Sequence, residues 1–344
     1  MLALHSGSLA SRVATALIDR MPNVEGMHLL YFRSPFFAEA ECIRDCAKLE
    51  WPASPFRTQS LKKEFRRLAN IPVRRRFSLR RSCLSCRTLF LAHALRYMER
   101  IGADFIVTGE IVGRNGLEED DLVRVMRNAG ATGQVLRPLS ARLLPPTPVE
   151  SSGAIPRKAL AGLVADDQDG LMDLASSLGI AADGAMDCYK RCRLTAPGYG
   201  TRLENLLREE RFTLNALRLL DFRLYYKQDP DVKFVLATDE EEKRALQNLL
   251  LPQDLRVYLP THRGPMCLVR TDWSSKDPAE VEEIIEFACR VTATHSEASD
   301  HASVLVCYRF ENHDETSQLS VGPFTAVEEI ARYCFASETF TSLV

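Results

Sequence analysis

The chain has 344 residues, of which 46% are hydrophobic and 26% charged, and its formal net charge is −2, as expected for a globular protein of about two domains. Its ten cysteines are far too sparse for a disulfide-stapled scaffold, and no apolar run approaches the length of a membrane span or follows a cationic signal region. We therefore expect a soluble cytoplasmic protein with reduced thiols and no membrane partner.

The N-terminus predicts a strand, a tight turn and a helix. An apolar run at residues 1–4 precedes the turn HSGSLAS (residues 5–11), and apolar positions then recur at helical spacing up to Met21. In such a unit, backbone N–H groups and the positive end of the helix converge on a ready anion site. Taken alone the turn is weak evidence, since most turns of this composition are only turns.

Strand-like and helix-like segments alternate over the following residues. We expect buried strands at 24–32 and 104–109, a short strand within GQVLRPLS, and helices at 38–49, 59–69 and 89–101. This alternation predicts an α/β fold with a doubly wound, mainly parallel sheet. Ligands of such sheets bind beyond the carboxyl ends of the strands, where both HSGSLAS and the tripeptide TGE (residues 108–110) lie.

The later part of the chain predicts a second domain. A proline-rich stretch at 143–156 ends the sheet region, and from residue 222 short strands are interleaved with helices at 240–250 and 278–292. We expect a first domain at 1–200, a linker helix at 201–221 and a smaller α+β domain at 222–344.

The CLSC segment is the first candidate for chemistry. Cys83 and Cys86, expected in a turn ahead of the helix at 89–101, could hold a metal or one edge of a cluster, or act as a redox pair. A structural zinc is an equally common interpretation, but the only comparable pair, Cys188 and Cys192, is more widely spaced than zinc sites require. Nearby cations lower a thiol's pKa and favour the thiolate; those next to this pair are Arg80, Arg81 and Arg87.

A basic segment spans residues 59–88, in which Glu64 is the only acidic residue. Charge runs are usually solvated faces, but such faces mix the two signs. We therefore expect a polyanion partner whose phosphates this segment contacts. The candidate RNA-binding residues are Lys62, Lys63, Arg66, Arg67, Arg74, Arg75, Arg76, Arg80 and Arg81.

Six motifs in order carry a family resemblance: HSGSLAS, VEGMHLLYFRSPFF, CLSC, GADFIVTGEIVG, LRPLSARLLPPT and CRLTAP. With them, the chain from Met1 to about Leu206 resembles the PP-loop ATP pyrophosphatases that thiolate tRNA, the 2-thiouridylase and 4-thiouridine synthase-like enzymes. The later stretch FRLYYKQDPDVKFVLATDEEEKRAL…GPMCLV resembles an RNA-binding domain of the NFACT type.

The resemblance implies an ATP-dependent tRNA sulfurtransferase. ATP would adenylate a uridine carbonyl oxygen, and sulfur, supplied by a donor protein or inorganic sulfide, would then attack the activated carbon from a cysteine persulfide or an iron–sulfur cluster. Catalysis would fall to Cys86 and Cys192, and a four-iron four-sulfur cluster would be held by Cys83, Cys86 and Cys192. The other cofactors implied are ATP and Mg²⁺, with ATP bound by Ser6, Gly7, Ser8, Ser11, His28 and Gly109; His28, on its predicted buried strand, is by itself more typical of a core histidine.

Two departures from the family's SGGxDS loop favour an alternative function. Ser8 replaces the second glycine, and Ala10 replaces an aspartate that lies near the metal and the phosphates. Ala10 cannot supply a carboxylate, which removes part of the charge neutralisation that nucleotidyl transfer requires. The alternative is a degenerate, non-catalytic relative that binds tRNA or another RNA, whereas the complete cysteine set favours the enzyme.

Overall fold

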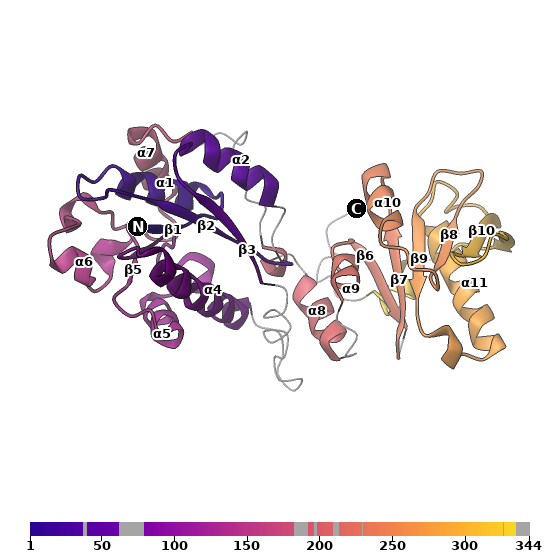
Figure 1. The fold of residues 1–344 in the computed structure, drawn as a ribbon. Helices are drawn as coiled ribbons and strands as arrows, with labels where there is room; N and C mark the ends of the chain where they lie inside the picture. The colour runs from indigo at the N-terminus through magenta and orange to yellow at the C-terminus, as the bar shows by residue number, and fades with distance from the viewer. Residues whose placement is uncertain are drawn as a thin grey trace. The chain divides into compact units, whose positions relative to one another are not determined.

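The computed structural model describes residues 1–36, 40–61, 79–181, 192–195, 198–208, 213–228, 230–325 and 327–334. Two compact units follow one another along the chain, with the division between Thr195 and Ala196. Each unit has its own sheet and its own hydrophobic core (Figure 1).

The first unit is built on a five-stranded sheet in which every neighbouring pair of strands is parallel. Its strands are β1 (Leu2–Leu4), β2 (His28–Arg33), β3 (Phe56–Ser60), β4 (Ile106–Thr108) and β5 (Val135–Leu136), in the order β3-β2-β1-β4-β5. The predicted doubly wound parallel sheet is confirmed. Its central strands are apolar and buried on both faces, as parallel sheets require.

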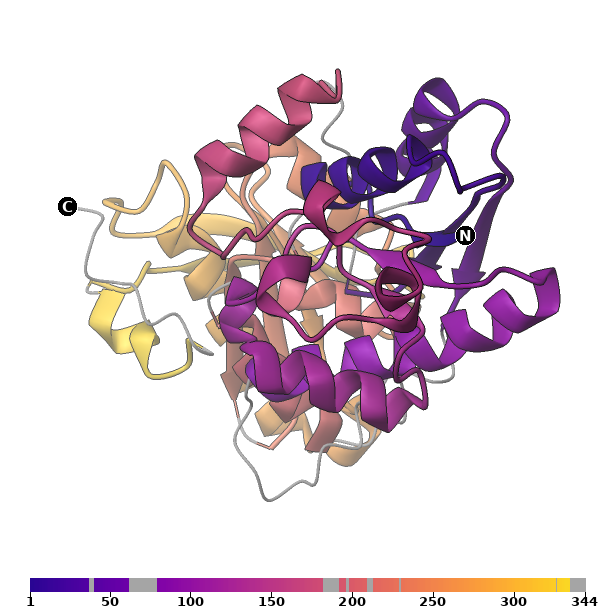
Figure 2. The same ribbon diagram turned by 90° about the vertical axis from the view of Figure 1, so that its left-hand side faces the viewer.

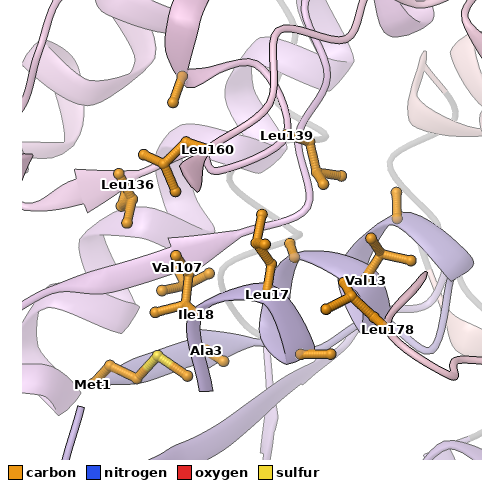
Figure 3. Packing of buried hydrophobic residues seen from close by; sticks show 14 of the residues in the cluster. Met1, Ala3, Val13, Leu17, Ile18, Val107, Leu136, Leu139, Leu160 and Leu178 are labelled. Atoms are coloured by element: carbon orange, nitrogen blue, oxygen red, sulfur yellow. The ribbon is translucent and has the colours of Figure 1, made fainter. Parts of the chain in front are cut away.

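Helices cover both faces of this sheet (Figure 2). They are α1 (Leu9–Asp19), α2 (Ala40–Glu50), α4 (Leu79–Ile101), α5 (Glu119–Ala129), α6 (Pro148–Ser151) and α7 (Gln168–Ser177), with short 3₁₀ turns at Arg114–Gly116, Ala141–Leu143, Arg157–Ala159 and Arg193–Thr195. The core packs α1 against the sheet: Val13, Leu17 and Ile18 meet Ala3, Val107 and Leu136 (Figure 3). Burial of these side chains supplies the main driving force for the unit.

Three boundaries differ from the sequence predictions. The second strand begins at His28 rather than at residue 24, and Gln59, expected to open a helix, lies in β3 instead. Helix α4 begins at Leu79, ten residues before the predicted start, so Cys83 and Cys86 lie within the helix and not in a turn ahead of it. A spacing of three residues on a helix places both thiols on the same face.

The second unit is an antiparallel sheet with helices. Its strands are β6 (Leu224–Gln228), β7 (Val232–Ala237), β8 (Leu255–Tyr258), β9 (Met266–Arg270), β10 (Val304–Phe310) and β11 (Ser317–Val321), in the order β11-β10-β8-β9-β7-β6. The helices are α8 (Tyr199–Arg208), α9 (Leu214–Leu219), α10 (Glu240–Gln247), α11 (Pro278–Thr294) and α12 (Val327–Ala331), with a 3₁₀ turn at Trp273–Ser275. The segment expected to be one linker helix contains α8 and α9, which belong to this unit.

Helix α11 forms the core of the second unit with one face of the sheet. It begins at a capping box in which Asp277 and Glu280 accept hydrogen bonds from each other's backbone N–H, and Pro278 opens its first turn. Its buried residues Ile284, Ala288 and Val291 share a cluster with Phe234 and Val257 of the strands. None of the helices in the described part of the chain combines the length and apolar character that a membrane span requires.

Candidate functional site: the turn after β1 and the three cysteines

The turn between β1 and α1 has the geometry of an anion site. Gly7 adopts a φ of +78°, where a side chain is strained, and an added Cβ would lie 3.1 Å from Ile43. Ser8 is the N-cap of α1 with φ −71° and ψ 152°, an ordinary extended conformation, and its Oγ accepts a hydrogen bond from the Ser11 N–H at 3.2 Å. A serine is therefore accommodated at this position, where an SGGxDS loop has its second glycine. The N–H groups of Leu9 and Ala10 open the helix and have no carbonyl of an earlier turn to donate to.

The end of β4 touches this turn directly. A Cβ added to Gly109 would lie 2.5 Å from both the Cα and the backbone N of Ser11, closer than any real contact. Only glycine allows the two backbones to approach in this way. The strand order reverses between β1 and β4, which is the switch point at which ligands bind in open α/β sheets. HSGSLAS and TGE therefore lie next to each other at the carboxyl ends of the neighbouring strands β1 and β4.

The structure brings Cys83, Cys86 and Cys192 together in the first unit. Cys83 and Cys192 both act electrostatically on the thiol of Cys86, and Cys83 also acts on that of Cys192. Cys192 directly precedes the 3₁₀ turn at Arg193–Thr195, which is fastened to the chain just after β2: the Arg193 N–H donates to the Phe36 carbonyl at 3.0 Å and its guanidinium donates to the Pro35 carbonyl at 2.8 Å. Three sulfurs, two from one helix and one from more than a hundred residues further on, therefore share one site.

Burial sets the pKa values of two of these thiols. It raises the pKa of Cys86 to about 12, with the neighbouring Cys192 and Cys83 adding to the rise and Arg87 opposing it. It likewise raises the pKa of Cys192 to about 11. The expectation that nearby arginines lower the thiol pKa is therefore wrong for Cys86, because the loss of hydration of the thiolate outweighs the attraction of the guanidinium. In this structure both groups are protonated thiols at neutral pH.

Glu110, the acid of TGE, is held between two arginines. Its Oε1 accepts from the Arg87 Nε at 2.8 Å, and its Oε2 accepts from the Arg137 Nε at 2.8 Å and from the Thr108 hydroxyl at 3.3 Å. Burial alone would raise the pKa of Glu110, but Arg137 and Arg87 outweigh it and the pKa is lowered. Arg87 also interacts with Cys83, so the ion-pair network of Arg87, Glu110 and Arg137 reaches the cysteine site.

The described residues contain no ready-made site for a single metal ion. Within the residues described, no group of three or more His, Cys, Asp and Glu side chains is arranged to hold a metal ion. A four-iron four-sulfur cluster is larger than a single ion, so a cluster held by Cys83, Cys86 and Cys192 stays a prediction. Both carboxylate oxygens of Glu110 are engaged by arginines, and residue 10 is alanine, so neither stands in for the aspartate expected near Mg²⁺.

The residue before the turn, His5, is unexpected. It is 1% exposed, its ring meets Trp51 and Phe56 edge-on with centroids 5.5 and 6.3 Å away, and neither ring nitrogen has a hydrogen-bond partner among the described residues. Burial, aided by the positive charge of Arg12, lowers the pKa of His5 to about 4. The imidazole is neutral in the folded protein. Nothing in the sequence signals this residue, because its burial depends on α2 and β3.

His5 makes stability depend on pH. Because its folded pKa lies below the unfolded value of 6.5, the unfolded chain binds more protons between pH 6.5 and 4, and the free energy of unfolding should fall there by about 3 kcal/mol as pH is lowered. His5→Leu should lose this part of the pH dependence. Urea unfolding of the first unit, followed by Trp51 fluorescence in a Trp273→Phe background, measures the difference. His262→Leu in the second unit is the control, and equal pH slopes for the wild type and His5→Leu would contradict the assignment.

Other predicted site residues are not brought together. His28 is paired in register with Leu2 at the amino ends of β2 and β1, whereas the turn follows the carboxyl end of β1, so the assignment of His28 to the ATP site is wrong for a geometric reason. Most of the predicted RNA-binding residues lie outside the described residues: Lys62, Lys63, Arg66, Arg67, Arg74, Arg75 and Arg76. The same holds for Cys188 and for the side chains of Arg80 and Arg81.

Cys42 on α2 is disulfide-bonded, contrary to the expectation of reduced thiols.

Comparison with known proteins gives one domain match. Residues 225–334 match the family model of the NFACT protein RNA binding domain, NFACT-R_2. This match supports an RNA partner for the second unit. A search of characterised proteins finds no match to the chain.

Two solved structures show weak similarity. One is the C-terminal part of the fibronectin/fibrinogen-binding protein from Streptococcus suis, with 11% identity, a TM-score of 0.28, and coverage of 48% of this chain and 72% of that one. The other is a 4-thiouridine synthetase in complex with RNA and bound ATP, with 18% identity, a TM-score of 0.34, and coverage of 63% of this chain and 51% of that one. The alignment therefore spans about half the length of that synthetase.

Proposed function

We propose that this chain is an RNA-modifying sulfurtransferase that uses ATP to thiolate a uridine of tRNA. The observation that carries the proposal is the convergence of Cys83, Cys86 and Cys192 within the unit that also contains the turn HSGSLAS at the start of α1. A module that only binds RNA has no use for three gathered thiols. The match of residues 225–334 to an RNA-binding domain supports RNA as the substrate.

The turn would hold the phosphates of ATP. The unpaired N–H groups at the start of α1 and the positive end of the helix favour negative charge, and the close approach of Gly109 keeps side chains away from this point. ATP supplies the adenylyl group that makes a uridine carbonyl oxygen into a leaving group. Because Ala10 offers no carboxylate, we expect nucleotide binding to persist and adenylation to be slow.

The cysteines would carry the sulfur. A donor protein passes a sulfur atom to Cys86 as a persulfide, whose terminal sulfur attacks the activated carbon and displaces AMP. Cys192 then attacks the sulfur of Cys86, which leaves thiouridine on the tRNA and a disulfide between the two cysteines that an external thiol reduces. The high pKa of both thiols means that a base or the incoming donor must remove their protons.

The same site supports a second candidate, an RNA-binding protein that has lost catalysis. The observation in its favour is that Ala10 stands at the metal-organising position, while the neighbouring Glu110 has both oxygens bound by arginines. In this case the chain would bind tRNA, and nucleotide weakly, without modifying either.

Cysteine substitution tests the proposed function. Cys86→Ser and Cys192→Ser should each lower the yield of thiolated nucleoside, measured by mass spectrometry of digested tRNA, by more than about 100-fold, because serine forms no persulfide. Cys46→Ala is the matched control, since Cys46 packs against Tyr31 and Ile43 in a separate cluster of the same unit. Full thiolation by Cys86→Ser would refute the sulfur relay. Tight tRNA binding without thiolation by the wild type would favour the second candidate.

A further inference from the structure

The RNA-binding domain match falls on a strongly acidic segment. Residues 225–334 contain eleven Lys and Arg against twenty Asp and Glu, a formal net charge of −9. Such a charge repels a polyanion, so any RNA contact must use a locally basic surface. Much of the acidic charge lies on helices, in the first turn of α10 and along α11.

The Lys and Arg residues of the strands in this segment all lie on one face of the sheet. Helix α11 packs on the face that carries Phe234, Val257 and Cys267. The strand register places five of the eleven Lys and Arg side chains on the opposite face, one on each of five strands: Lys227, Lys233, Arg270, Arg256 and Arg309. Alternation along each strand fixes this assignment, because residues two apart share a face.

On one half of this face, Arg270 and Lys227 bind polar side chains of the same unit. The Arg270 guanidinium makes two bonds to Asp254, at 2.8 and 2.6 Å, and donates to Asn215 of α9 at 2.7 Å. The Lys227 ammonium donates to Asn205 of α8 at 3.1 Å. These contacts hold α8 and α9 on β6 and β9, so this half of the face is covered.

The other half, on β8, β10 and β11, carries basic and aromatic side chains that are partly exposed. Arg256 binds the Glu311 carboxylate at 2.7 Å, whereas the Arg309 guanidinium, 34% exposed, lies 3.9 Å from the same carboxylate. Tyr258 lies beside them across the strand pair, opposite Cys307, and Leu305 is 37% exposed on the same face. Arg256 and Arg309 thus share one carboxylate on this part of the sheet.

We propose that the open face of β8, β10 and β11 binds single-stranded RNA, with Arg309 contacting a phosphate and the Tyr258 ring stacking on a base. The proposal rests on RNA being the partner in the proposed function. Diagonal neighbours on paired strands are about 7–8 Å apart, so one nucleotide can reach both side chains. Tyr258 is half-buried. An aromatic ring beside a cation is the usual platform for unpaired bases, whereas double-stranded RNA is contacted mainly along its backbone.

Binding of a fluorescent oligouridylate to the full chain, measured over a range of salt, tests this surface. Arg309→Glu should weaken binding about tenfold and reduce the slope of log affinity against log salt by about 0.7 for each phosphate that is no longer neutralised. Tyr258→Ala should weaken binding on the order of tenfold with little change in slope, since stacking does not release counterions. Glu311→Gln should strengthen binding, because it removes the carboxylate that Arg256 and Arg309 share.

Lys243→Glu on α10 is the matched charge-reversal control, since Lys243 is paired with Glu240 in an acidic turn and should leave binding unchanged. Arg309→Lys should keep the salt slope, and unchanged circular dichroism would show that each variant is folded. If the wild type binds RNA and Arg309→Glu and Tyr258→Ala bind equally well, the proposed surface is refuted while the proposed function stands. If the wild type binds neither oligouridylate nor tRNA, the RNA partner itself is refuted and the surface with it.

Discussion

Glu110→Ala is expected to lower the free energy of unfolding of the first unit by about 3–5 kcal/mol. The substitution leaves Arg87 and Arg137 without their shared carboxylate, and the Arg137 side chain is only 2% exposed. A buried guanidinium without a counterion costs far more than the pair itself contributes, because the desolvation of the charge is no longer compensated. Urea unfolding followed by Trp51 fluorescence, in a Trp273→Phe background, isolates the transition of the first unit.

Two further variants separate this explanation from general damage. Glu99→Ala removes an exposed carboxylate of α4 in the same unit and should change its stability by less than about 0.5 kcal/mol. The triple variant Glu110→Leu, Arg87→Met and Arg137→Met should recover much of the loss, since apolar replacement of a whole buried charge network is often tolerated. A triple variant as unstable as Glu110→Ala would contradict the charge argument and indicate that the shape of these residues matters instead.

Most of the parallel sheet was predictable because four of its five strands are short apolar runs between turns. The fifth, β3, is largely polar and was not predicted. Residues 1–4 and 104–109 are apolar segments that only a sheet buried on both faces accommodates, and the glycine-containing segments after them mark the carboxyl ends. The start of α4 was not predictable in the same way. Its first turns, LRRSCLSCR, lack an apolar stripe, and the hydrophobic period begins only near Leu89.

The residues of the candidate site were predictable from motifs, but the burial and the ion-pair partners of their side chains were not. The family resemblance that CLSC and CRLTAP carry implied which cysteines belong together. The direction of the Cys86 pKa shift could not be inferred from neighbouring arginines, since burial is a property of the folded unit. Arg87, expected to lower the pKa of the CLSC thiols, is paired with Glu110. The role of Arg137 required the adjacency of β4 and β5, although its place in the LRPLS motif was visible.

Gly109 packs closely against the turn, so a substitution at the end of β4 also changes the turn HSGSLAS, the other segment of the candidate ATP site. The Gly109 backbone lies against residues 10 and 11 at the start of α1. Any side chain at position 109 must therefore displace the helix end whose N–H groups would hold the phosphates. Packing here is backbone against backbone, and no flexible side chain can move aside to relieve it.

Gly109→Ala is accordingly expected to destabilise the first unit by at least about 3 kcal/mol and to abolish nucleotide binding. The new Cβ would lie 2.5 Å from the Ser11 Cα and N, and 2.7 Å from the carbonyl carbon of Ala10, so the start of α1 must shift. Gly102→Ala is the matched control: Gly102 has a positive φ of 66°, but its Cβ meets nothing within 4 Å, so only local backbone strain is added there. Urea unfolding and equilibrium dialysis with labelled ATP measure the two effects. Wild-type stability in Gly109→Ala would show that the turn and β4 do not pack backbone against backbone, whereas normal ATP binding by a destabilised Gly109→Ala would place the nucleotide away from the turn.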